Sequence, residues 1–232
     1  MAQAPEKSHD IPKINTNEIN NVYKDMIASF NGAKRLTPLW VCARKKNFGF
    51  RPTLERDFLP QIMYDWIASM KMGLVVVVPL IFYACEEKDI EKEEKNTQGK
   101  LFDPNFLVYS HYNVLISYIA SDGSIIIERY EPSSISQQGN LQEKLEDLFQ
   151  NSFSNYTERV VNFKLVAPKG LQAKYGDTRL CGHHIIYWTI YRLKYGLQAS
   201  VDMLTDNVSI DRFESFCKCM KDLGIAQCRA NV

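Results

Sequence analysis

Two apolar, β-branched runs separated by a short turn constrain the fold of this chain most. Residues 106–120 (FLVYSHYNVLISYIA) and 124–132 (SIIIERYEP) have the composition of strands, and SDG at 121–123 favours a hairpin between them. Pro132 ends the second strand because proline cannot donate to a ladder. The loop length decides which side chains share a face of the sheet, since a slip of one residue turns every side chain over.

We expect a three-residue loop with Gly123 in the left-handed conformation. Glu131 then faces Asn113, and His111 lies diagonal to Glu131 on the same face, within reach of long side chains. Glu128 points to the opposite face. A two-residue turn would separate His111 from Glu131, so a contact between them requires an odd loop length or a bulge.

The remaining elements surround this hairpin. The patterns predict helices at 16–30, 54–71, 140–153, 181–196 and 209–224, and further strands at 74–84 and 159–167. This order predicts an α+β fold with a mostly antiparallel central sheet flanked by helices. The length of 232 residues suits a single domain at 15–232 after a flexible, polar arm at 1–14.

Charge and hydropathy narrow the range of partners. The formal net charge is +1, from 28 basic and 27 acidic side chains, so charge gives no support to nucleic acid as an activator. The compact basic run ARKK at 43–46 is expected to be a solvated loop. The longest apolar run, residues 74–85, is too short to cross a bilayer as a helix, so no membrane span is predicted.

The cysteines favour a reducing, intracellular environment. There are six of them and no secretory signal, which argues against a disulfide framework. Cys217, Cys219 and Cys228 cluster near the C-terminus, but Cys-x-Cys is not a usual zinc spacing. We therefore expect small packing residues on a helix, with no metal and no cofactor.

Four residues form a candidate catalytic set. His111 lies in a strand, Glu131 ends the paired strand, Gln172 lies in a loop, and Cys181 opens a buried helix. A helix N-terminus favours a thiolate, which is the nucleophile, and its N–H groups can stabilise an oxyanion. Gln172 would add a second donor. His111 would be the base, oriented by Glu131.

The two histidines after Cys181 are weaker candidates for the base. Neighbours one residue apart on a helix do not face each other, and His184 would have to share a helix with the nucleophile. Packing or a local hydrogen bond is the expected role of both His183 and His184. A strand histidine or a buried cysteine, taken singly, is also most often a packing residue, so the prediction depends on the ordered set.

These motifs resemble the clan of cysteine proteases that contains the adenovirus maturation protease and the SUMO proteases. HYNVLISYIASDGSIIIERYEPSS looks like the His-to-acid hairpin, LQAKYGDTRLCGHHIIYW looks like the Gln-to-Cys segment, and YEPSS is similar to an aromatic-Glu-Pro signature of the adenovirus enzyme. VVVVPL, the His-x-Asn hairpin and a Cys followed by Trp also resemble clan relatives of large DNA viruses. The resemblance covers about residues 73–195.

The chain departs from the clan at three positions. Tyr112 stands where many members have Trp, and Leu180 replaces an Asp or small residue before Cys181. Gln172 lies farther from Cys181 than is usual.

The resemblance implies an adenain-like or ubiquitin-like-protease-like fold and peptide-bond hydrolysis through a thioester, often after small residues. The implied protein is a viral maturation protease that cleaves capsid or core precursors, with capsid association, in the virion and the host cytoplasm. Three alternatives stay open. They are removal of ubiquitin-like modifiers from host conjugates, acetyl transfer, and an inactive virion structural (minor capsid) protein with the same fold.

Overall fold

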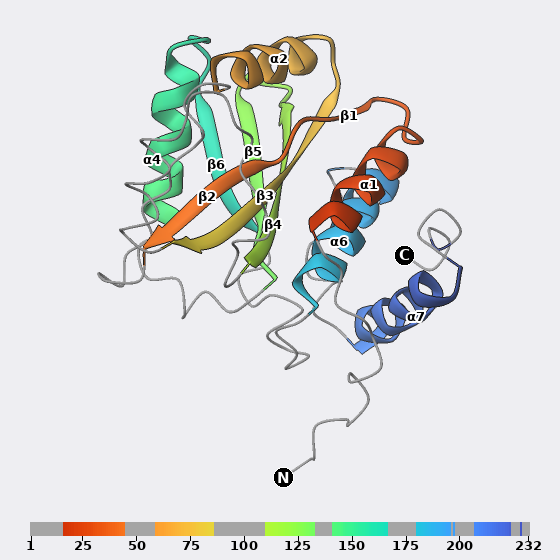
Figure 1. Ribbon diagram of the computed structural model, residues 1–232. Helices are drawn as coiled ribbons and strands as arrows, with labels where there is room; N and C mark the ends of the chain where they lie inside the picture. Colours follow the sequence, from red (N-terminus) through yellow and green to blue (C-terminus); the bar gives the residue numbers. More distant parts are fainter. Residues whose placement is uncertain are drawn as a thin grey trace.

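The computed structural model describes residues 16–44, 59–85, 110–132, 141–166, 180–195, 197, 207–223 and 228. The described elements are α1 (Thr16–Ile27), β1 (Ala33–Arg35), β2 (Leu39–Arg44), α2 (Leu59–Lys71), β3 (Val75–Cys85), β4 (Ser110–Ile119), β5 (Ile125–Tyr130), α4 (Leu141–Ser154), β6 (Val161–Val166), α6 (Cys181–Tyr195) and α7 (Asn207–Leu223). A twisted sheet lies between α2 and α4 on one face and α1 and α6 on the other, with α7 beside α6 (Figure 1). The structure thus confirms the α+β prediction.

The sheet has six strands and is mixed, which corrects the expectation of a mostly antiparallel sheet. Its order is β1-β3-β4-β5-β6, and β2 also pairs with β3. The β3–β4 and β4–β5 pairs are antiparallel, whereas β1–β3, β2–β3 and β5–β6 are parallel. Parallel neighbours need a crossover. Helix α2 supplies one between β2 and β3, and α4 supplies another between β5 and β6.

Strands β1 and β2 were not among the predicted elements. They run along successive parts of β3, with Ala33 opposite Val75 and Leu39 opposite Leu80. Ala43 and Arg44 close β2, so the loop expected at the basic run is wrong for its first half. Short strands with charged side chains carry little periodic signal, and their partner lies far along the chain.

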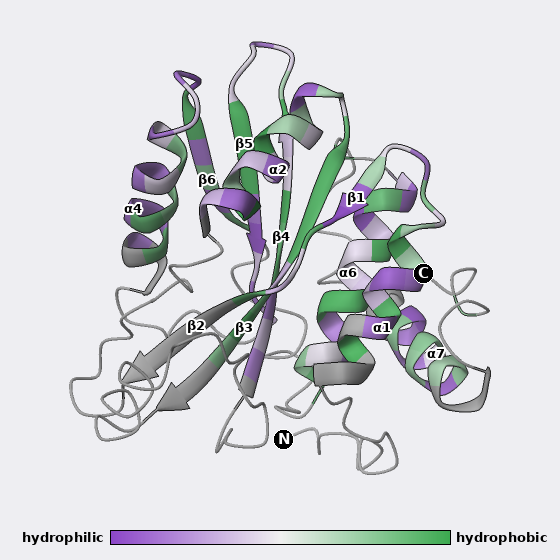
Figure 2. Cartoon of the chain, turned by 45° about the horizontal axis from the view of Figure 1, so that its top comes forward, coloured by the Kyte–Doolittle hydropathy of each residue, from purple (hydrophilic) through white to green (hydrophobic). Residues whose placement is uncertain are grey.

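Alternation along the strands divides the core into two clusters. Val114 and Ile116 of β4 pack with α1, α6 and α7, whereas Leu115 packs with α2 and α4. In Figure 2 the central strands are largely coloured hydrophobic, while the helices that cover them show both colours. Helix α6 is buried on all sides, because its residues from Cys181 to Arg192 are all buried. The predicted buried helix is therefore confirmed.

The predicted helices and hairpin strands agree with the structure. At the majority of the ends that the structure describes, the difference is no more than a few residues. Parts of those predictions lie outside the described residues, among them the N-terminal arm 1–14, residues 54–58 and residues 106–109. In the part of the chain that is described, no helix combines the length and the apolar character needed to cross a membrane.

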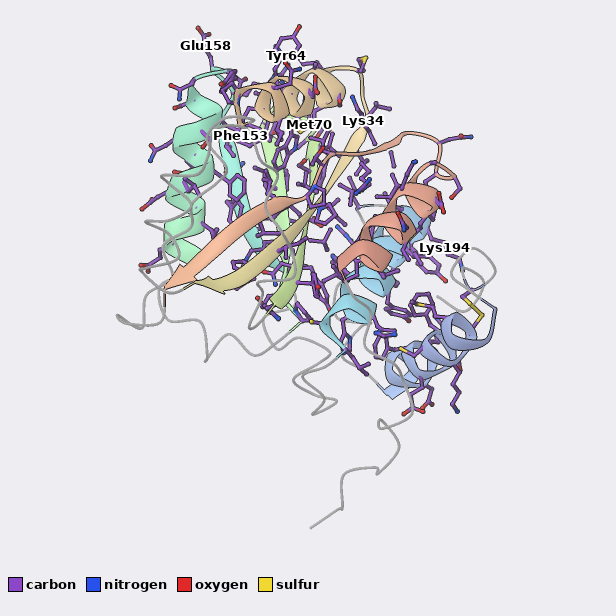
Figure 3. All side chains as sticks on the ribbon, in the orientation of Figure 1. Lys34, Tyr64, Met70, Phe153, Glu158 and Lys194 are labelled. Atoms are coloured by element: carbon purple, nitrogen blue, oxygen red, sulfur yellow. A yellow bond between two sulfur atoms is a disulfide. The ribbon has the colours of Figure 1, made fainter. Side chains whose placement is uncertain are left out.

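The C-terminal cysteines differ from expectation. Cys219 and Cys228 form a disulfide, visible as the yellow bond near α7 in Figure 3. The prediction of simple packing residues is thus wrong for these two, and it is confirmed for Cys217, which is buried and unbonded. The pairing was not evident from the sequence because it depends on where the chain returns after α7.

Candidate active site

The β4–β5 hairpin has the predicted register. Val114 pairs with Tyr130, and the N–H of Ala120 donates to the carbonyl of Ser124 at 2.8 Å. Gly123 has φ of 85°, the left-handed conformation that a three-residue loop requires. The structure therefore confirms both the loop length and the shared face of His111 and Glu131.

His111 and Glu131 are in direct contact. Nε2 of His111 lies 2.6 Å from Oε1 of Glu131. The Glu131 side chain is fully buried immediately after β5, and the His111 side chain keeps 14% of its exposure at the start of β4. The carboxylate thus holds one ring nitrogen of a histidine that still reaches the surface.

Cys181 is the first residue of α6, whose N-terminal end lies beside the start of β4 (Figure 1). The first intrahelical bond of α6 runs from the N–H of His184 to the carbonyl of Leu180 at 3.0 Å. The N–H groups of the preceding helical residues, Cys181 included, thus belong to the first turn, where they have no intrahelical acceptor. Cys181 is 3% exposed, and its thiol lies close enough to His111 to help raise the pKa of that histidine.

The charge state of His111 follows from its neighbours. Burial is the largest effect and lowers the pKa of His111. The charge of Glu131, the hydrogen bonds to Cys181 and Glu131 and the charge of Cys181 together outweigh burial and raise the pKa from 6.5 to about 10. His111 is therefore an imidazolium at neutral pH. Because Nε2 faces Glu131, Nδ1 is the nitrogen available to the thiol.

Two further residues belong to the site and were missed as site residues. Asn113 Nδ2 donates to Oε2 of Glu131 at 2.9 Å and lies 3.2 Å from Nε2 of His111. Arg129 Nη1 donates to Oδ1 of Asn113 at 2.8 Å and lies 3.5 Å from Oε2 of Glu131. The predicted register already placed Asn113 opposite Glu131, and Arg129 lies two residues before Glu131 on the same strand. That pattern is the signal that identifies them.

The structure does not place the other residues considered from the sequence beside His111 and Cys181. Gln172 lies outside the described residues. The His184 ring stacks on Phe213 of α7, with ring centroids 4.0 Å apart, and His183 is buried in the first turn of α6. Glu128 lies on the opposite face, as predicted, where Arg192 of α6 binds it at 2.9 Å.

No metal site accompanies this arrangement in the described ranges. Among those residues, no group of three or more His, Cys, Asp and Glu side chains is placed to hold a metal ion. The chemistry available to the described site is that of a thiol, an imidazole and a carboxylate in contact. Such a set can carry out acyl transfer at a carbonyl carbon.

Comparison with known proteins adds information about the fold. No family model and no curated protein matches the sequence. The solved structure of ChlaDub1 from Chlamydia trachomatis is similar with a TM-score of 0.53 and 12% identity, over 99% of this chain and 95% of that chain. The chain therefore shares the α+β fold of ChlaDub1.

The central domain of the uncharacterised Lpg1148 protein from Legionella pneumophila is less similar. Its TM-score is 0.45 at 11% identity, over 95% of this chain and 99% of that chain, and nothing further follows from this likeness. Of the predicted resemblance, the likeness to ChlaDub1 bears on the fold alone. The adenovirus part has no support from a family model.

Proposed function

We propose that the chain is a cysteine endopeptidase. Cys181 is the nucleophile, His111 is the base and acid, and Glu131 orients His111. The observation that carries the proposal is the continuous contact from Glu131 through His111 to Cys181 at the start of a buried helix. The helix N-terminus and the neighbouring imidazolium both favour the thiolate, which is the nucleophilic form of a cysteine.

The reaction follows from these positions. The Cys181 thiolate attacks the carbonyl carbon of the scissile peptide, and the developing oxyanion is stabilised by N–H groups at the start of α6. His111 then gives its proton to the leaving amine as the C–N bond breaks, which leaves a thioester. Water, losing its proton to His111, attacks the thioester and releases the new carboxyl terminus. From the sequence, Gln172 is the proposed second oxyanion donor.

The proposed substrates are viral structural precursors, cleaved during assembly in the virion or the host cytoplasm in association with the capsid. The similarity of YEPSS to the adenovirus signature supports this setting. The low exposure of Cys181, 3%, fits a substrate with small residues at the cleavage point, which the resemblance implies.

A second candidate is removal of ubiquitin-like modifiers from conjugates. One observation favours it, the likeness in fold to ChlaDub1 over nearly the whole chain, since the name of ChlaDub1 marks it as a deubiquitinase. Both candidates use the same three residues. They differ only in the protein that presents its backbone to Cys181.

A panel of activity probes tests both the reaction and the substrate. Ubiquitin-like proteins with a thiol-reactive C-terminus, and Gly-Gly peptides carrying the same group, are incubated with wild type, Cys181→Ser and Cys217→Ser. The proposal expects adducts with wild type and Cys217→Ser and none with Cys181→Ser. Labelling by the Gly-Gly peptide but not by the ubiquitin-like proteins favours cleavage of viral precursors. Labelling by the ubiquitin-like proteins but not by the peptide favours removal of ubiquitin-like modifiers.

The same protein is then added to infected-cell lysate, with and without DNA, and precursor cleavage is followed. His111→Ala is the second inactive control. If wild type forms no adduct and cleaves nothing under either condition, the peptidase proposal fails. The inactive structural protein becomes the better account of the chain.

A further inference from the structure

We propose that Arg129 tunes this site through its charge: it holds Glu131 as an anion, directly and by way of Asn113, and its own positive charge opposes the imidazolium form of His111. A role of Arg129 in catalysis depends on the proposed function. The contacts among the three buried side chains, Asn113, Arg129 and Glu131, do not depend on that function.

The contacts form a directed series. A guanidinium can only donate hydrogen bonds, so the side-chain atom of Asn113 that faces Arg129 at 2.8 Å must be Oδ1. The amide is thereby fixed, and Nδ2 donates to Oε2 of Glu131 at 2.9 Å. With Oε2 engaged, Oε1 faces Nε2 of His111 at 2.6 Å. Arg129 thus sets the orientation of an amide that would otherwise have two.

Packing alone does not explain why an arginine occupies the fully buried position 129. Asn113, Arg129 and Glu131 each have zero exposure. Arginine stays charged in proteins, and a buried cation requires a buried anion beside it. Apolar residues of similar volume are often at least as stabilising as a buried ion pair. Stability therefore gives little reason for an arginine here, whereas a fixed carboxylate beside a catalytic histidine gives a direct one.

Several charged groups on the neighbouring elements are engaged elsewhere. On α2 and α4, which cover the face of the sheet that carries Arg129, Asp65 accepts from Gln61 and Glu146 accepts from Gln150 at exposed positions. On the opposite face, Glu128 accepts from Arg192 and Tyr118. Strand β6 places Leu165 beside Arg129 in register.

Two cations, Arg129 and the His111 imidazolium, therefore share one carboxylate. The positive charge of Arg129 repels the imidazolium and stabilises the state in which His111 is neutral and Glu131 is charged. Removal of that charge should make His111 hold its proton to higher pH. The direction of this shift separates a charge effect from a general loosening of the fold.

The experiment follows the titration of the His111 ring by NMR in the full chain, with the resonance assigned by His111→Gln. We expect Arg129→Gln, which keeps a donor but removes the charge, to raise the pKa of His111 by about 1 unit, a tenfold change in its proton dissociation constant. Arg129→Lys keeps the charge and should leave the titration near that of wild type. Arg192→Gln is the matched control, because it removes another buried guanidinium on the other face, and it should also leave the titration unchanged.

An unchanged titration in Arg129→Gln, or equal shifts in Arg129→Gln and Arg192→Gln, overturns the inference. If Arg129→Gln alone does not fold, Arg129→Gln combined with Glu131→Gln should fold, since both buried charges are then absent, and failure of that double variant also overturns it. Alkylation of Cys181 in wild type is measured in parallel. Slow alkylation there counts against the proposed peptidase, whereas the His111 titration tests Arg129 alone.

Discussion

Replacing Glu131 by Gln should destabilise the protein more than replacing Glu131 and Arg129 together. The single change keeps the shape of the side chain but leaves the buried guanidinium without this carboxylate. Breaking a buried pair from one side costs about 3–5 kcal/mol. For a chain of this size, each kcal/mol shifts Tm by about 2–4 °C, so Glu131→Gln should lower Tm by about 6–20 °C at pH 7.

The assay is thermal unfolding of wild type, both single variants and the double variant, checked by urea unfolding. The double variant lacks the buried guanidinium of Arg129 as well, so its Tm should be higher than that of Glu131→Gln. Glu128→Gln and Arg192→Gln form the matched cycle on the other face, because that pair is also buried and bridged at 2.9 Å. A Glu131→Gln variant within 2 °C of wild type, or a double variant that loses the sum of both single losses, would refute the coupling of the two charges.

The remaining predictions concern titration and the thiols. Because the pKa of folded His111 lies above 6.5, its stabilising contribution is complete below pH 6.5 and is lost as pH rises through about 10, so wild type should lose more stability than His111→Gln across that window in pH-dependent unfolding. Iodoacetamide at pH 6–7 should modify Cys181 well before Cys217, because burial raises the pKa of the Cys217 thiol, and mass spectrometry that finds equal labelling would contradict this order. Reducing the Cys219–Cys228 bond should cost about 2–3 kcal/mol for a loop this short, visible as a lower Tm in reductant that Cys228→Ser does not show.

The sequence was most informative where the structure is local. The register of the β4–β5 hairpin follows from a three-residue turn and from the alternation of side chains, so the contact between His111 and Glu131 could be predicted in advance. The start of α6 at Cys181 was also predictable from nearby residues, because a long apolar run follows a glycine-containing segment of the sequence. These features depend on neighbours within one hairpin or one helix.

The sequence was least informative where segments distant in the chain meet. Strands β1 and β2 gain their identity from pairing with β3, which no local pattern reveals. Charged residues are rarely buried, so no local pattern indicated that the Arg129 side chain would be fully buried. The Cys219–Cys228 pair depends on the path of the chain after α7.

The alternation along β4 and β5 also sets what can vary among relatives of this chain. His111 and Asn113 are two apart, as are Arg129 and Glu131, so each pair keeps one face only while its spacing is preserved. Glu128 and Glu131 are an odd number apart and so must stay on opposite faces, each with its own arginine. An insertion of two residues at the turn keeps this parity, whereas a single inserted residue, at the turn or inside either strand, moves one partner to the wrong side unless a bulge absorbs it. Divergent relatives should therefore be recognisable by His-x-Asn followed, after a turn of odd length, by Glu-Arg-x-Glu.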